Sequence, residues 1–145
     1  MKVFVDANTI VSGLLFGGNE AVLLELGRLG ALHLVTNEYV WMEVREVLKR
    51  EEFRLTGEET QRLMRYVLEC ISVAENPSGD EIKKHYDLLK DKKDLPIIAG
   101  AKKDDCEYLV TGDKELLSEK VKQLVNSVTT SELVEKLIKE KFLRL

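Results

Sequence analysis

The sequence predicts an α/β protein: a three-layer sandwich in which a central, mostly parallel sheet of four to five strands lies between helices. Short apolar, β-branched runs alternate along the chain with longer segments whose apolar residues recur at helical spacing. Such alternation is typical of parallel strands joined by right-handed helical crossovers. The length of 145 residues and the 44% hydrophobic content suit one packed domain, which we expect to span residues 1–145.

Each expected strand is a short apolar run that ends at a polar or turn-forming residue. Val3-Phe4-Val5 ends at Asp6, and Tyr108-Leu109-Val110-Thr111 ends at Gly112-Asp113. The expected strands are residues 3–5, 32–35, 71–73, 108–111 and 125–128.

The expected helices combine an apolar face with a polar residue at the start. Asn8 is expected to cap the first helix, Thr36 or Asn37 the helix after the second strand, and Thr130 or Ser131 the last. The expected helical segments run from 8 to near 17 and over 20–28, 37–48, 58–69, 82–89, 96–101 and 132–141, with Pro96 in a first turn and a loop at 76–80.

Composition argues against several kinds of protein. The formal net charge of −4 disfavours a passive nucleic-acid-binding module, which would need positive charge, but it is compatible with an enzyme whose divalent cations bridge carboxylates and phosphates. Cys70 and Cys106 form no disulfide framework, as expected in a reducing compartment. No apolar run approaches the length of a membrane span, so we expect a cytoplasmic protein without membrane association.

Four carboxylates are expected at one edge of the sheet. Asp6 and Asp113 follow two strands, and ligands of parallel sheets bind at the carboxyl ends of the strands. Glu43 and Asp94 lie near the starts of helices that reach the same edge. Crowded anions repel one another, and a hard divalent cation such as Mg²⁺ or Mn²⁺ relieves that repulsion and activates water.

Every one of these acids also has an ordinary structural interpretation. Asp6 and Asp94 suit helix caps, Glu43 a solvated helix position, and Asp113 a turn. The combination therefore carries the prediction, not any single position. Glu46 and Asp91 remain alternatives to Glu43 and Asp94 as ligands, because each lies three residues from the acid that it would replace.

Four segments, taken in order, resemble the PIN-domain family. They are residues 3–12 with Asp6 and Asn8, 37–48 with Glu43, 91–101 with Asp94, and 108–117 with Thr111 and Asp113. Within the family, the chain looks most like the toxin components of toxin–antitoxin pairs, including the VapC type. Two features differ from the most compact toxins: the longer, more charged stretch at 82–93 and the competing acids Glu46 and Asp91.

The resemblance implies a Mg²⁺- or Mn²⁺-dependent endoribonuclease that forms a homodimer, cleaves RNA and is held inactive by a small antitoxin protein. It implies that Asp6, Glu43, Asp94 and Asp113 are the catalytic metal ligands, with Asp6 central, while Asn8 and Thr111 orient carboxylates. The positive charge that RNA needs beside these acids is expected from Arg45, Lys92, Lys93 and Lys114.

Two other functions remain open from the sequence, and a third is disfavoured. A PIN fold also suits a nuclease of RNA maturation, or a non-catalytic module that binds RNA or protein. A phosphatase of the haloacid-dehalogenase type also ends its first strand on an aspartate. That chemistry needs a second aspartate two positions later, where this chain has Asn8.

Overall fold

The computed structural model describes residues 1–142, and its five strands form one sheet. The sheet order is β3-β2-β1-β4-β5, and every neighbouring pair is parallel. The expected α/β class with a four- to five-stranded parallel sheet is therefore confirmed. The strands are β1 (Lys2–Val5), β2 (His33–Asn37), β3 (Ile71–Ala74), β4 (Tyr108–Val110) and β5 (Ser127–Val128).

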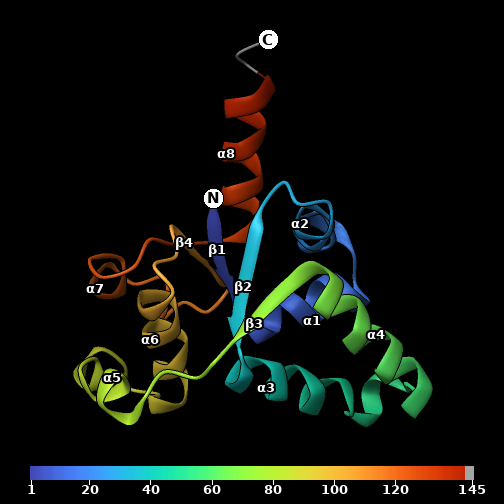
Figure 1. The fold of residues 1–145 in the computed structure, drawn as a ribbon, viewed down its shortest axis with the longest axis horizontal. Coiled ribbons are helices and arrows are strands. Elements are labelled where there is room, and N and C mark those ends of the chain that lie inside the picture. Colours follow the sequence, from blue (N-terminus) through green and yellow to red (C-terminus); the bar gives the residue numbers. More distant parts are fainter. Residues whose placement is uncertain (143–145) are drawn as a thin grey trace.

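Helices cover both faces of this sheet (Figure 1). Helices α1, α2 and α4 lie on one side of the sheet, and α5, α6 and α7 lie on the other. Helix α3 runs past the carboxyl ends of the strands, and α8 projects away from the rest of the molecule. The helices are α1 (Ala7–Leu15), α2 (Gly18–Arg28), α3 (Glu38–Leu48), α4 (Gly57–Cys70), α5 (Gly79–Lys83), α6 (Leu95–Lys103), α7 (Glu119–Lys122) and α8 (Thr130–Phe142), with short 3₁₀ turns η1 (Glu51–Phe53), η2 (Tyr86–Leu88) and η3 (Lys92–Asp94).

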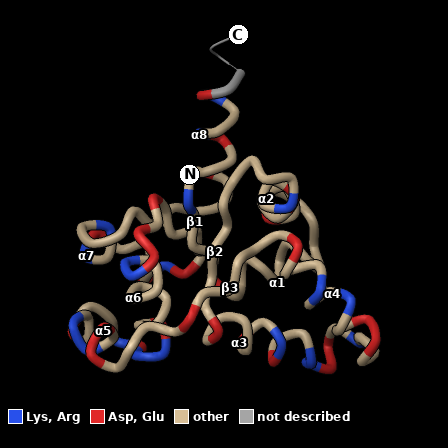
Figure 2. Tube along the Cα trace, viewed as in Figure 1, with Lys and Arg blue, Asp and Glu red and all other residues tan. Residues whose placement is uncertain are grey.

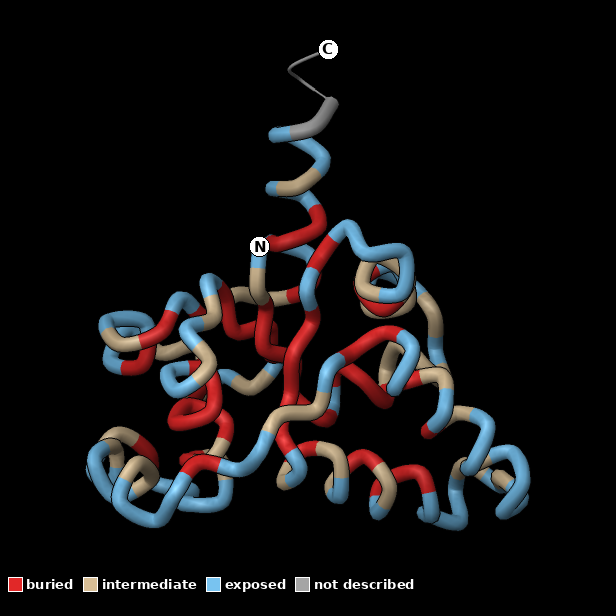
Figure 3. Tube along the Cα trace, in the orientation of Figure 1, coloured by how far each residue is buried: buried red, intermediate tan, exposed pale blue. Residues whose placement is uncertain are grey.

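The core is built on the central strands. Val3, Phe4 and Val5 of β1 are fully buried, because β1 lies between β2 and β4 and helices cover both of its faces (Figure 3). Lys2 is the only charged residue within the five strands, and the other charges lie on helices and loops (Figure 2). A near-continuous apolar run is what a strand buried on both faces requires.

Helix starts agree only partly with the sequence-based expectations. Asn37 caps α3 as expected, with its side chain accepting a hydrogen bond from the backbone N–H of Val40. The expected cap at Asn8 is wrong, because Asp6 takes that position and α1 begins at Ala7. The last helix is capped one residue earlier than expected, since the Thr129 hydroxyl accepts from the N–H of Glu132.

The segment between β3 and α6 differs most from the prediction. In place of a helix over 82–89, α5 begins inside the expected loop and ends at Lys83. Ser78 and Glu81 form a reciprocal capping box that fixes this early start. Within 82–89 only the short turn η2 follows, so the apolar residues of this stretch belong to two short elements and not to one helix.

No single helix within residues 1–142 is long and apolar enough to cross a bilayer. Only α1 and α2 together reach the required length and composition, and the chain bends by 98° between them.

Asn37 fixes the start of α3 relative to the start of α6. It is fully buried, and while its Oδ1 caps α3, its Nδ2 donates to the carbonyl of Pro96 at 3.1 Å. A Cβ on Gly100 would lie 2.7 Å from that Nδ2, so α6 approaches this closely only because residue 100 is glycine. One amide side chain thus holds together the starts of α3 and α6, which lie at the carboxyl edge of the sheet, that is, the edge formed by the carboxyl ends of the parallel strands.

We predict that Asn37→Ala lowers the free energy of unfolding by about 2–3 kcal/mol, because it removes a cap and the side-chain hydrogen bond to the part-buried Pro96 carbonyl. Thr56→Ala, which removes the exposed cap of α4, should cost only about 1 kcal/mol. Urea denaturation compares the two variants. Equal losses would show that the bond between α3 and α6 contributes nothing.

Candidate metal centre

Asp6 lies at the centre of the carboxyl edge and is only 4% exposed. It follows β1 directly, and both of its carboxylate oxygens have partners. Oδ1 accepts the backbone N–H of Thr9 at 3.0 Å, and Oδ2 accepts the hydroxyl of Thr111 at 2.5 Å. Asp6 is therefore both the cap of α1 and a carboxylate fixed in orientation by the neighbouring strand.

Thr111 connects Asp6 to Asp113. While its Oγ1 donates to Asp6, the same oxygen accepts the backbone N–H of Asp113 at 3.1 Å. Asp113 in turn accepts the N–H of Glu115 at 2.8 Å, which fixes the turn after β4. Because β1 and β4 pair in parallel, the two aspartates leave the sheet at the same edge.

Asp94 and Glu43 reach this edge from two helices. Asp94 precedes α6 but makes no side-chain cap bond there, so its carboxylate is free of the ordinary structural role. Glu43 lies one turn into α3 and is half-buried. The close start of α3 and α6, fixed by Asn37, brings both acids toward Asp6.

The four acids interact through their charges. Burial, followed by the charges of Asp113, Asp91, Glu43 and Asp6, raises the pKa of the Asp94 carboxyl to about 7. Burial also raises the pKa of Asp6, where the bonds from Thr111 and Thr9 oppose the rise and the charge of Asp113 adds to it. Burial, then the charge of Asp6, raises the pKa of Glu43. The fold therefore holds anions together at an energetic cost.

The competing acids differ in position. Glu46 is exposed and lies 3.5 Å from Lys49 in an ion pair, and its charge is not among those that raise the pKa values of Asp6, Glu43 and Asp94. Asp91 is exposed and caps the turn η3 through the N–H of Lys93, yet its charge acts on both Asp94 and Glu43. Between Glu43 and Glu46, the structure favours Glu43 as the ligand. Asp91 does not replace Asp94 but is a fifth acid close to the four carboxylates.

The donor set suits a hard divalent cation. Among residues 1–142, no three Asp, Glu, His or Cys side chains already converge closely enough to form a complete cage around an ion. Mg²⁺ does not need one, because it is commonly bound by one or two carboxylates together with water and substrate phosphate. Donors that are all carboxylate oxygens, held where burial and neighbouring charge raise the pKa of Asp94, fit Mg²⁺ or Mn²⁺ and do not fit a zinc cage.

The basic side chains near the acids are only partly those expected. Arg50 and Lys93 act on Glu43, where both charges lower the carboxyl pKa. Lys92 is instead used locally, since its Nζ donates to the carbonyls of Tyr86 and Leu89. Lys114 is exposed beside Asp113.

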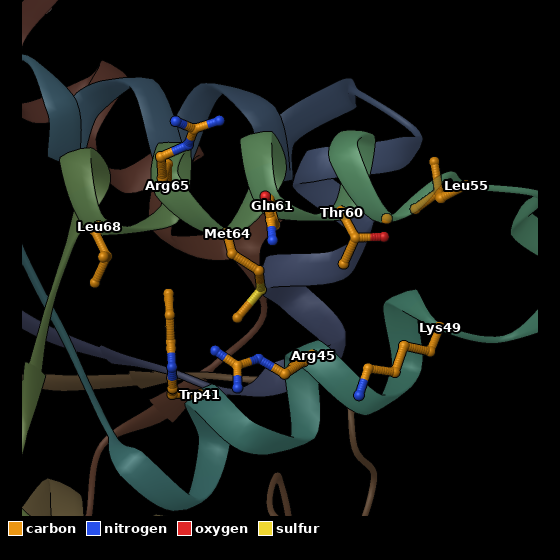
Figure 4. A pocket seen from close by; sticks show the side chains of 10 residues that line it. Trp41, Arg45, Lys49, Leu55, Thr60, Gln61, Met64, Arg65 and Leu68 are labelled. Carbon is orange, nitrogen blue, oxygen red and sulfur yellow. The ribbon is translucent and has the colours of Figure 1, made fainter.

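Arg45 lies elsewhere, in a cavity of about 710 Å³ between α3 and α4. Figure 4 shows Arg45 and Trp41 rising from α3 toward Met64 and Gln61 of α4. Glu43 is two residues along the helix from each and so occupies a different face of α3. The expectation that Arg45 lines the acidic site is therefore wrong.

Tyr39 and Arg50 are site residues that the sequence analysis missed. Burial, then the charges of Glu43, Asp94 and Asp91, raises the pKa of the Tyr39 phenol. The four-residue spacing from Tyr39 to Glu43 is the signal that would have found it, since such residues share a helix face. Asn8, expected beside the acids, is exposed and donates to no carboxylate within the described part of the chain.

Comparison with known proteins agrees with this geometry. The family model of the PIN domain matches residues 2–115, which contain all four acids. The chain belongs to the PIN-domain family. No curated protein sequence matches it.

Two solved structures share this PIN fold. VapBC2 from Rickettsia felis, crystallised with a DNA fragment from its promoter, superposes with a TM-score of 0.67 at 16% identity, covering 89% of this chain and 98% of that one. The protein PAE2754 from Pyrobaculum aerophilum also gives a TM-score of 0.67, at 21% identity, covering 94% of this chain and 95% of that one. At these identities the likeness shows the fold.

Without metal, the acids should make the protein less stable at neutral pH than in weak acid. The raised pKa of Asp94 means that the folded chain holds a proton that the unfolded chain loses above about pH 4, so stability falls as pH rises toward 7. We predict that Asp94→Asn in EDTA stabilises the fold by about 1–2 kcal/mol at pH 7, after allowance for solvent screening, and by little at pH 4.

Thermal unfolding across this pH range measures the effect. Asp87→Asn, a change on the exposed turn η2, serves as the control and should give no such pH-dependent gain. A stability difference between wild type and Asp94→Asn that does not change with pH would contradict the predicted repulsion.

Proposed function

We propose that this PIN-domain protein is a Mg²⁺- or Mn²⁺-dependent endoribonuclease. The observation that carries the proposal is the gathering of Asp6, Glu43, Asp94 and Asp113 from four separate segments at one sheet edge. There, burial together with the charge of at least one neighbouring acid raises the pKa values of Asp6, Glu43 and Asp94. A scaffold gains nothing from such repulsion, whereas a bound divalent cation would relieve it.

A bound divalent cation would supply an activated water and neutralise charge on the leaving oxygen of a phosphodiester. The chain's own residues prepare that site. Thr9 and Thr111 hold both oxygens of Asp6, so its orientation does not change when substrate arrives. Tyr39, whose raised pKa keeps the phenol protonated, offers a hydrogen-bond donor at the rim.

Positive charge beside the acids would hold the RNA backbone. Arg50 and Lys93 act on Glu43 and are the cations best situated to contact phosphates on either side of the scissile bond. They offset the acidic character of the rim locally, in a chain whose net charge is −4.

The proposed biological role is that of a toxin in a toxin–antitoxin pair. The resemblance of its four segments to VapC-type toxins and the shared fold with VapBC2 support this role. On this proposal the chain is a single cytoplasmic domain that forms a homodimer and is held inactive by a small antitoxin protein. Expression of a toxin should arrest cell growth, and co-expression of its small antitoxin protein should restore growth. Expression of a nuclease of RNA maturation should not arrest growth.

Glu43→Gln should reduce metal-dependent cleavage of pooled single-stranded RNA by at least about a hundredfold, since loss of a ligand exceeds the effect of a supporting residue. Glu46→Gln, the same change three residues along α3, should retain nearly full activity because Glu46 faces Lys49. Gel analysis of cleaved RNA compares the two. Equal activity of both variants would exclude Glu43 as a ligand.

Arg50→Ala should weaken RNA binding and reduce the slope of log affinity against log salt by about 0.7, the value for one lost phosphate contact on a single strand. Lys49→Ala is the matched control, because Lys49 lines the cavity between α3 and α4. Fluorescence anisotropy at several salt concentrations measures both slopes. If Lys49→Ala changes the slope and Arg50→Ala does not, the RNA path has been assigned to the wrong face of α3.

A further inference from the structure

A second cavity adjoins the acidic site on the far side of Thr111. Its volume is about 350 Å³, within the roughly 300–1,000 Å³ typical of small-ligand sites. It lies where the start of α1, the start of α2, the turn after β4 and the start of α8 meet. Thr9 and Thr111, which both bond to Asp6, form its wall toward the acids.

The residues that line this cavity are mostly of polar types, and one of them carries a formal charge. Six hydroxyl side chains, from Thr9, Ser12, Thr111, Thr129, Thr130 and Ser131, line it together with Asn8 and Gly112. Glu20 supplies the one carboxylate, and no lysine or arginine of the described residues lines the space. A cavity without cations is unsuited to a phosphate but suited to a neutral, hydrogen-bonding group.

Glu20 has an unused capacity to accept hydrogen bonds. Within residues 1–142 its carboxylate forms no ion pair and receives no side-chain or capping hydrogen bond. Ser131, by contrast, already has a partner, since its hydroxyl accepts from the side-chain amide of Asn19 at 3.1 Å. Among the described residues that line this space, Glu20 thus supplies the one anionic acceptor, and that acceptor has no partner.

We propose that this cavity is a base-binding subsite that accepts a guanine flanking the scissile phosphate, with Glu20 as the residue that selects it. The inference rests on the proposed nuclease function for its setting. One hydrogen bond, from Thr111 to Asp6, separates the cavity from the acids, so a nucleotide whose phosphate lies at Asp6 has its base within reach of the cavity.

Guanine is selected by the chemistry of the acceptor. A carboxylate accepts two hydrogen bonds side by side, and guanine presents two adjacent donors, N1–H and the N2 amino group, on its pairing edge. Adenine and cytosine present one amino group beside an acceptor nitrogen, which the carboxylate repels. Uracil presents one imide N–H between two carbonyl oxygens.

Binding of free nucleosides tests the subsite without the metal centre, because nucleosides carry no phosphate. In metal-free buffer, NMR titration should show guanosine shifting the backbone amides of Ser12, Gly112 and Ser131, with an affinity at least about tenfold above those for adenosine, cytidine and uridine. Glu20→Gln should abolish this preference. Glu58→Gln, an acid in the first turn of α4, should leave it intact.

Equal binding of the four nucleosides by wild type, or an unchanged guanosine preference in Glu20→Gln, would overturn the proposal. Cleavage separates this failure from failure of the nuclease function. Wild type should cut an RNA pool with guanine enriched on one side of the cut, and Glu20→Gln should cut with that enrichment lost. Metal-dependent cutting without a guanine preference would contradict only the proposed guanine subsite. Guanosine binding without any cutting would contradict the proposed nuclease function.

Discussion

The buried carboxylate of Asp6 is the constraint on which the rest of the structure depends. A carboxylate that is 4% exposed must have its oxygens satisfied, and here one takes the Thr9 N–H and the other the Thr111 hydroxyl. These bonds require that α1 start immediately after β1 and that β4 lie next to β1. The sheet order with β1 at the centre therefore follows the same arrangement that brings Asp113 to the site.

The site stores repulsion that the surrounding fold must withstand. Asn37 ties the starts of α3 and α6 together, and a close approach at Gly100 permits it, so Glu43 and Asp94 cannot move apart freely. This rigidity explains how burial and neighbouring charge raise the pKa of Asp94 to about 7 without the acids separating. Strain held at a site and supported by packing elsewhere is typical of functional centres.

Much of the fold and the grouping of the acids follow from sequence. Apolar runs that end on Asp6 and Asp113 identify the central strands, because a strand buried on both faces leaves no polar alternation to misread. The segment 82–89 was mispredicted because the capping box at Ser78 and Glu81 overrides apolar spacing. Arg45 was misplaced and Arg50 missed because proximity in sequence does not reveal which face of α3 a side chain occupies.

Calorimetric titration of Mn²⁺ into the wild type and into Asp6→Asn tests the metal centre most directly. We expect saturable binding by the wild type and loss of most of that heat in Asp6→Asn, because Asp6 is the most deeply buried of the four acids. Circular dichroism should show both proteins equally folded. Equal Mn²⁺ binding by the two, or none by either in the presence of RNA, would contradict the assignment of these carboxylates as a metal site.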